Sequence, residues 1–204
     1  MIKAIIFDLG RVIVPFDFIH AYRRAEHLSG IPAAEIRARM AASGLVERLD
    51  CGQIAPRDFA SALCRQIDLD VSYEDFCAIW NSIFLPETLI SEALLAGLAA
   101  RYRLVLLSNT NVIHFEAVRR NYPLLRHFHS LVLSYEVGAM KPDPAIYQRA
   151  VKEACCAPSE CFFTDDIAAY VEATKGQGID AVQFHSGGQT ENELRARGVE
   201  WNRQ

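Results

Sequence analysis

The chain has 204 residues, of which 51% are hydrophobic and 23% are charged, and its formal net charge at pH 7 is −4. A chain of this length can bury one substantial core, and the composition is ordinary for a globular protein. The slightly acidic balance gives no electrostatic reason to expect binding to nucleic acid or to an anionic membrane. Because the sequence has no run of 18 apolar residues and no signal-peptide pattern, we expect a cytoplasmic protein.

The first part of the chain changes from strand to helix. Residues 2–8 predict a short strand that ends at Asp8. The strand is apolar on both faces, as is typical of buried parallel strands. Residues 16–85 show helical periodicity and no convincing strand, with pieces near 17–28, 33–43, 56–67 and 72–84. The polar segment 47–54 contains Gly52 and is predicted to be a turn between two of these helices.

From residue 86 onward, strand and helix patterns alternate. Strands are predicted at 103–108, 130–134, 161–164 and 180–184, and helices at 87–101, 112–121, 143–155, 167–177 and, in the tail, 191–204. This alternation indicates an α/β fold with a parallel sheet wrapped by helices. The first strand has to join that sheet, so we expect residues 1–15 and 86–204 to form the core and residues 16–85 to form a helical insertion.

Residues capable of chemistry follow the predicted strands. Asp8 ends the first strand, Ser108 and Asn109 end the second, Lys141 follows the third, and Asp165 and Asp166 end the fourth. One such carboxylate is often a helix cap, and one Lys-Pro pair is often a solvated turn. In an open parallel sheet, however, the carboxyl ends of the strands meet at the edge where ligands bind. The set together therefore points to a catalytic site.

These residue types support phosphoryl transfer through a covalent carboxylate. Asp8 can attack phosphorus, and the acids at 165–166 can help it to hold Mg²⁺, which prefers oxygen ligands. Ser108, Asn109 and the N–H groups of the following helix can bind the phosphate oxygens. Lys141 can offset the negative charge that nucleophile and phosphate bring together.

Four ordered segments resemble the motifs of the haloacid dehalogenase (HAD) superfamily: Asp8-Leu-Gly-Arg-Val, Leu107-Ser108-Asn109, Lys141-Pro142 and Phe163-Thr164-Asp165-Asp166. The similarity is greatest to the branch that holds bacterial α-D-glucose-1-phosphate phosphatase and the N-terminal phosphatase domain of soluble epoxide hydrolase. The resemblance implies a Rossmann-like three-layer core with a small all-helical C1-type cap. It also implies Asp8 as nucleophile, Asp166 as direct metal ligand and Asp165 as an indirect one.

Gly10 departs from the pattern of most phosphatases in this superfamily, which have a second aspartate two residues after the nucleophile. That aspartate is the general acid, whereas the metal is bound there by a backbone carbonyl, which Gly10 retains. Three interpretations stay open. The leading one is a phosphatase for a small phosphorylated metabolite, with sugar phosphates favoured. The others are a non-catalytic phosphate-binding protein and a metal-free 2-haloacid dehalogenase.

The cap is expected to supply recognition groups. Our hypothesis is that Arg48, Asp50 or Gln53 meets the leaving group, with Asp50 as a substitute acid, although a solvated turn is the alternative for each. Arg11 is a candidate for the mouth of the pocket or a carbonyl cap. The six histidines are interpreted as structural or surface residues, and the protein as a monomer or weak homodimer.

Overall fold

The computed structural model describes residues 1–201 and confirms the α/β class. Five strands form one parallel sheet in the order β3-β2-β1-β4-β5. The strands are β1 (Ala4–Phe7), β2 (Arg103–Ser108), β3 (Ser130–Leu133), β4 (Cys161–Asp165) and β5 (Asp180–Gln183). All four residues of β1 are buried, because helices cover both faces of the strand at the centre of the sheet.

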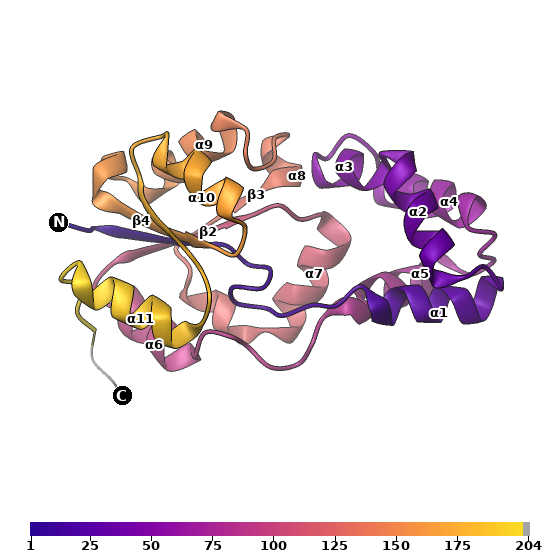
Figure 1. Cartoon of the computed structure of the whole chain (residues 1–204), viewed down its shortest axis with the longest axis horizontal. Helices are drawn as coiled ribbons and strands as arrows, with labels where there is room; N and C mark the ends of the chain where they lie inside the picture. Colours follow the sequence, from indigo (N-terminus) through magenta and orange to yellow (C-terminus); the bar gives the residue numbers. More distant parts are fainter. Residues whose placement is uncertain (202–204) are drawn as a thin grey trace.

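Helices form one layer on each face of the sheet (Figure 1). Ile5 and Phe7 point to the layer of α6 (Glu92–Ala99), α7 (Val112–Asn121) and α11 (Gly187–Ala196). Ala4 and Ile6 alternate to the other face, where α9 (Pro144–Ala154) and α10 (Ala168–Lys175) pack. Three short elements complete this lobe: η2 (Pro123–His127), α8 (Ser134–Val137) and η3 (Pro158–Glu160).

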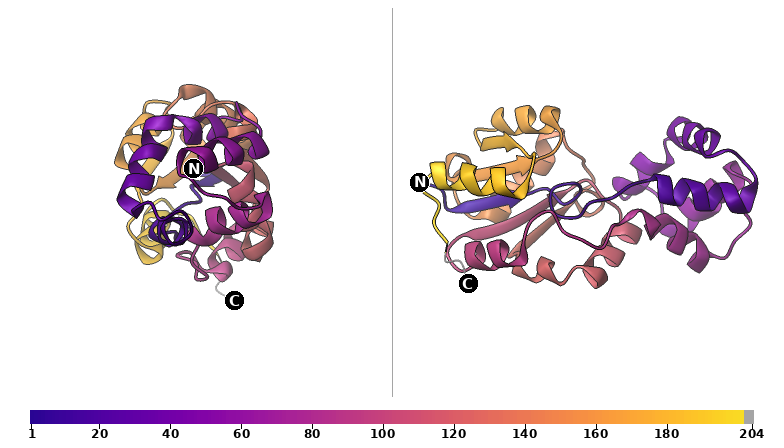
Figure 2. Two further views of the ribbon diagram at one scale, coloured as in Figure 1. Left: turned by 90° about the vertical axis from the view of Figure 1, so that its right-hand side faces the viewer. Right: turned by 60° about the horizontal axis from the view of Figure 1, so that its bottom comes forward.

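A second, all-helical lobe follows β1 (Figure 2). It contains α1 (Ile19–Ser29), α2 (Ala33–Ser43), α3 (Leu45–Asp50), α4 (Pro56–Gln66), α5 (Tyr73–Trp80) and η1 (Asn81–Ile83). Its buried side chains form a hydrophobic cluster that is separate from the two clusters beside the sheet. Phe16 and Phe84 pair in an antiparallel bridge where the chain leaves the sheet and returns to it. We keep 16–85 as our proposal for the extent of the cap.

Several helix boundaries differ from those expected. Part of the turn predicted at 47–54 is helical, because Leu45 and Leu49 lie one turn apart and both are buried in the cap. The helix expected from residue 87 begins at Glu92, since the Ser91 side chain accepts a hydrogen bond from the backbone N–H of Leu94. The last helix spans 187–196 rather than 191–204, and residues 202–204 lie outside the described part.

Candidate active site

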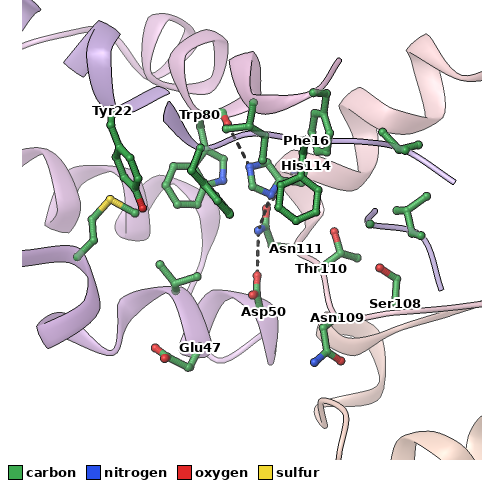
Figure 3. A pocket seen from close by; sticks show the side chains of 18 of the residues that line it. Phe16, Tyr22, Glu47, Asp50, Trp80, Ser108, Asn109, Thr110, Asn111 and His114 are labelled. Atoms are coloured by element: carbon green, nitrogen blue, oxygen red, sulfur yellow. Dashed lines mark hydrogen bonds between the residues drawn. The ribbon is translucent and has the colours of Figure 1, made fainter. Parts of the chain in front are cut away.

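The ends of the parallel strands bring the expected polar residues together. Asp8 follows β1, Ser108 is the last residue of β2 and Asp165 is the last residue of β4. β1 pairs with both β2 and β4, so these three positions are neighbours at one edge of the sheet. Ser108 and Asn109 also line a cavity beside this edge (Figure 3).

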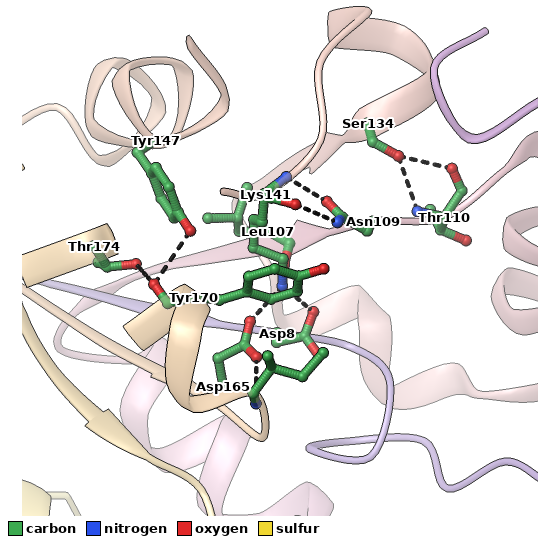
Figure 4. Close-up of polar contacts among 11 residues, drawn as sticks. Asp8, Leu107, Asn109, Thr110, Ser134, Lys141, Tyr147, Asp165, Tyr170 and Thr174 are labelled. Atoms are coloured by element: carbon green, nitrogen blue, oxygen red, sulfur yellow. Dashed lines mark hydrogen bonds and ion pairs between the residues drawn. The ribbon is translucent and has the colours of Figure 1, made fainter. Parts of the chain in front are cut away.

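Lys141 joins two of the carboxylates. Its ammonium nitrogen lies 2.6 Å from Asp8 Oδ1 and also donates to Asp165 Oδ2 (Figure 4). The three residues are almost fully buried, with exposed fractions of 3% for Lys141, 6% for Asp8 and 0% for Asp165. A buried cation between two buried anions is held by strong attraction, because little water is present to screen it.

Burial and neighbouring charge shift the pKa values of this cluster. Burial raises the Asp8 pKa to about 7, with Lys141 opposing the change and Asp165 adding to it. Burial works against the Lys141 ammonium, but the charges of Asp8 and Asp165 outweigh it, so the pKa of Lys141 is raised. Burial, together with the charge of Asp165, also raises the pKa of Asp166. With three carboxylates and one lysine, this cluster is short of positive charge.

The carboxylates of Asp8, Asp165 and Asp166 form a candidate metal site. One oxygen of each lies within 4.8 Å of the others, and Asp166 is only half-buried. A set made only of oxygen donors with a surplus of negative charge suits Mg²⁺, which takes one or two carboxylates and keeps several waters. The donor set therefore fits the metal that the sequence predicts. The Gly10 carbonyl stays a predicted ligand.

Asn109 positions Lys141. Its side-chain Oδ1 accepts a hydrogen bond from the Lys141 backbone N–H at 2.7 Å, and its Nδ2 donates to the Lys141 carbonyl at 3.0 Å. Both ends of the amide are therefore engaged with the loop that carries the lysine. In addition to the phosphate contact expected from the sequence, Asn109 thus fixes where the ammonium group lies.

The cavity beside the strand ends has a volume of about 290 Å³ and lies between the two lobes. The sheet lobe contributes Gly10, Ser108, Asn109, Thr110 and Asn111 to its lining. Most of the remaining lining is apolar or aromatic: Phe16, Phe18, Tyr22, Met40, Val46, Trp80, Ile83 and Phe84. This wall has no counterpart in the sequence motifs, because its residues are scattered through the cap and look like ordinary core positions.

The structure brings one expected cap residue to this cavity. Asp50, at the end of α3, accepts a hydrogen bond at 2.9 Å from Asn111 Nδ2 and lines the cavity together with Glu47. Arg48 and Gln53 are exposed and are not among the lining residues, so the hypothesis narrows to Asp50. The hydrogen bond between Asp50 and Asn111 joins the two lobes, and the sequence alone does not predict this contact.

Arg11 and His114 line different pockets. Arg11 stacks its guanidinium over the Phe16 ring, 4.9 Å from the centroid, and lines two neighbouring pockets, one of which also contains Asp166, rather than the cavity itself. Its place at the mouth of the pocket stays a prediction. His114 is buried and does line the cavity. Its Nε2 lies 3.1 Å from the Trp80 carbonyl oxygen, so it serves as structural support at the cavity wall.

A parallel sheet thus gathers an acid cluster and a buried lysine at its strand ends, beneath a helical lobe, which is the arrangement that the haloacid dehalogenase-like motifs imply. Residues 2–178 match the family model for haloacid dehalogenase-like hydrolases. The chain belongs to the haloacid dehalogenase-like hydrolase family. Among the described residues 1–201, no helix is long and apolar enough to cross a membrane.

Relatives named as phosphatases are similar over nearly the whole chain. D-ribitol-5-phosphate phosphatase of Bacteroides thetaiotaomicron is 29% identical over 201 residues, covering 95% of this chain and 97% of that protein. Phosphatase MT3486 of Mycobacterium tuberculosis is 27% identical, covering 93% and 90%. The similarity to the glucose-1-phosphate phosphatase branch stays a prediction.

Solved structures show the same architecture. A HAD family enzyme from Bacteroides thetaiotaomicron, in complex with magnesium and inorganic phosphate, matches with a TM-score of 0.84 at 27% identity, covering 92% of this chain and 96% of that one. The L-2-haloacid dehalogenase of Xanthobacter autotrophicus matches with a TM-score of 0.63 at 19% identity, covering 98% and 85%. The latter similarity is one of fold alone.

Proposed function

We propose that this protein is a Mg²⁺-dependent phosphatase that hydrolyses a small phosphorylated metabolite through an aspartyl-phosphate on Asp8. The buried contact between Asp8 and Lys141, set beside the Asp165–Asp166 pair, carries this proposal. Sugar phosphates stay the favoured substrate class, supported by relatives named for ribitol-5-phosphate and for phosphorylated carbohydrates. The predicted cytoplasmic location and the monomer or weak homodimer also stay proposals.

Each polar residue has a role in the proposed reaction. Asp8 attacks phosphorus, so its carboxylate has to be ionised although burial raises its pKa. Lys141 opposes that rise and neutralises charge as the anionic phosphate approaches. Ser108 and the N–H groups at the start of α7 bind phosphate oxygens, because a helix N-terminus attracts anions.

Asp8, the Gly10 carbonyl and Asp166 would hold Mg²⁺, with Asp165 as an indirect partner. Bound there, the ion would offset negative charge on carboxylate and phosphate. Asp165 already accepts hydrogen bonds from Lys141 and from the Ile167 backbone N–H, at 2.9 Å for the latter. It therefore orients the loop that presents Asp166.

A phosphate-release assay tests the proposal. Purified protein should hydrolyse p-nitrophenyl phosphate with Mg²⁺, and Asp8→Asn should abolish turnover while leaving the fold intact. Asp70→Asn is the matched control, because Asp70 is an exposed cap carboxylate that does not line the cavity. Failure to release phosphate across a panel of sugar phosphates would favour a binding protein, and metal-independent chloride release from a 2-haloacid would favour a dehalogenase.

A further inference from the structure

A side chain at Gly10, two residues after the nucleophile, would collide with the Phe16 ring. Gly10 has no side chain, and a Cβ atom added there would lie 2.7 Å from Cε1 of Phe16. That is too close for a real contact, so Phe16 occupies the space into which a longer residue would project. A proton for the leaving oxygen therefore has to come from another wall of the cavity.

Four of the five ionisable residues that line the cavity are poor donors. Arg37 stays protonated in proteins, and burial raises the Tyr22 pKa above its ordinary value of 10. His114 is neutral because burial lowers its pKa to about 4. Both His114 ring nitrogens are also engaged, at 3.1 Å from the Trp80 carbonyl and 3.3 Å from Asn111 Nδ2. Glu47 is exposed, and within residues 1–201 no hydrogen bond holds its side chain at the cavity, which leaves Asp50, the fifth.

Asp50 is held in place by a fixed amide. Asn111 caps α7, and its Oδ1 accepts the His114 backbone N–H at 3.0 Å while its Nδ2 faces Asp50 and the His114 ring. The Trp80 carbonyl can only accept, so His114 Nε2 is protonated and Nδ1 accepts from Asn111. A flipped Asn111 would turn its oxygen toward two acceptors. The Asn111 orientation, and with it the Asp50 contact, is therefore determined.

One Asp50 oxygen remains available. Oδ1 accepts from Asn111, and no other hydrogen bond to the Asp50 side chain exists within residues 1–201. Asp50 is half-buried in the lining of the cavity that also contains Gly10 and Ser108. Its second oxygen is thus free to meet a group bound beside the strand ends (Figure 3).

We propose that Asp50 is the general acid and base of the reaction, which rests on the phosphatase function proposed above. As Asp8 forms its bond to phosphorus and the ester bond breaks, the Asp50 carboxyl group gives its proton to the leaving oxygen. Water then attacks the phosphorus and passes a proton to the Asp50 carboxylate, the bond to Asp8 breaks, and phosphate leaves. Both half-reactions balance, and Asp50 returns to its starting state.

The protonation of Asp50 suits this role. Burial raises its pKa to about 6, the Asn111 hydrogen bond opposes the rise and Glu47 adds to it. Near neutral pH both protonation states are therefore populated, as an acid that later acts as a base requires. Around the cavity the facing groups are Tyr22 on α1, Arg37 on α2, Glu47 on α3 and His114 on α7. The charged residues of the other helices packed on α3 are all exposed: Arg57, Asp58, Arg65 and Glu136.

The test compares two substrates that differ in how much the leaving group needs a proton. p-Nitrophenyl phosphate releases a stable phenolate, whereas benzyl phosphate, similar in size, releases an alcohol. Asp50→Asn should lower kcat for benzyl phosphate about 10²–10⁴-fold and change kcat for p-nitrophenyl phosphate only a few-fold. Asp50→Glu should recover part of the loss, and Asp70→Asn should behave as wild type on both substrates.

The pH profile gives a second readout that a structural role would not move. For wild type, kcat on benzyl phosphate should fall above pH of about 6, and Asp50→Asn should lose this alkaline limb. Equal losses on both substrates, or no loss on benzyl phosphate, would overturn the proposal. So would a wild type that hydrolyses only p-nitrophenyl phosphate. A wild type that hydrolyses neither substrate with Mg²⁺ would refute the phosphatase function itself.

Discussion

Asp50 should cost the protein stability at neutral pH. Its carboxyl pKa rises from 3.8 to about 6 on folding, so the folded protein binds this proton more tightly than the unfolded chain does. Stability then falls as the pH rises through that window and stays lower above it. A shift of about two units, at 1.36 kcal/mol per unit, corresponds to about 3 kcal/mol.

Asp50→Asn should recover this free energy. The asparagine carbonyl can still accept the hydrogen bond from Asn111, so the substitution removes the charge and keeps the contact. For a chain of this size, about 3 kcal/mol corresponds to a rise in Tm of about 6–12 °C. The gain should appear at pH 8 and shrink as the pH is lowered toward 5.

Thermal unfolding followed by circular dichroism at several pH values measures this effect. Asp70→Asn is the control, because an exposed carboxylate should change stability by less than about 0.5 kcal/mol. If wild type and Asp50→Asn show the same Tm at pH 8, the Asp50 charge is compensated in the folded state and the reasoning fails. A variant that is more stable but slower on benzyl phosphate would show that this acid is kept for function.

Three further predictions concern the strand ends. Lys141→Met leaves Asp8 and its neighbouring carboxylate without a counter-charge, so it should abolish turnover and destabilise the fold by about 3–5 kcal/mol; an unchanged Tm would contradict the buried ion pairs. Gly10→Asp should lower Tm and should not raise the rate on benzyl phosphate, because Phe16 blocks the new side chain. The double variant Gly10→Asp with Phe16→Ala should raise that rate. If Gly10→Asp alone is as stable and as active as the double variant, the steric account is refuted. Mg²⁺ at about 100 times its Kd should stabilise wild type by about 2.7 kcal/mol, measured as a rise in Tm, and Asp166→Asn should lose most of that rise; an equal rise in both proteins would place the metal elsewhere.

The sheet and its polar edge could be predicted from sequence because both follow from local patterns. Apolar runs of four to six residues read as buried strands, and the residues that follow them must lie at one edge if the strands are parallel. Asp8, Ser108 and Asp165 meet for this reason alone. The strand order, in which β1 lies between β2 and β4, could not be predicted in the same way, because the sequences of the connecting helices do not specify it.

The helical cap and Asp50 were expected from the sequence, but the aromatic wall of the cavity was not, because its side chains do not differ in kind from packing residues. Tyr22 and Trp80 sit on cap helices at spacings expected of a helical core, and Phe16 lies in the segment that leads into the cap, yet all three line the cavity. Asn111 follows a strand end like its neighbours, and its contact with Asp50 spans 61 residues. Periodicity within one helix reports which face is buried. It does not report which other lobe that face meets.

The effect of having glycine at position 10 depends on the residues that pack around it in the fold. In the sequence, Gly10 reads as the loss of an acid from an otherwise ordinary motif. In the structure, the Phe16 ring fills the space above it, and Arg11 stacks on that ring in turn. Restoring the aspartate alone would therefore disturb this packing, and under our proposal Asp50 would still supply the proton. Gly10, Phe16 and Asp50 are expected to act as one unit, so that changing any one of them alters what the other two can do.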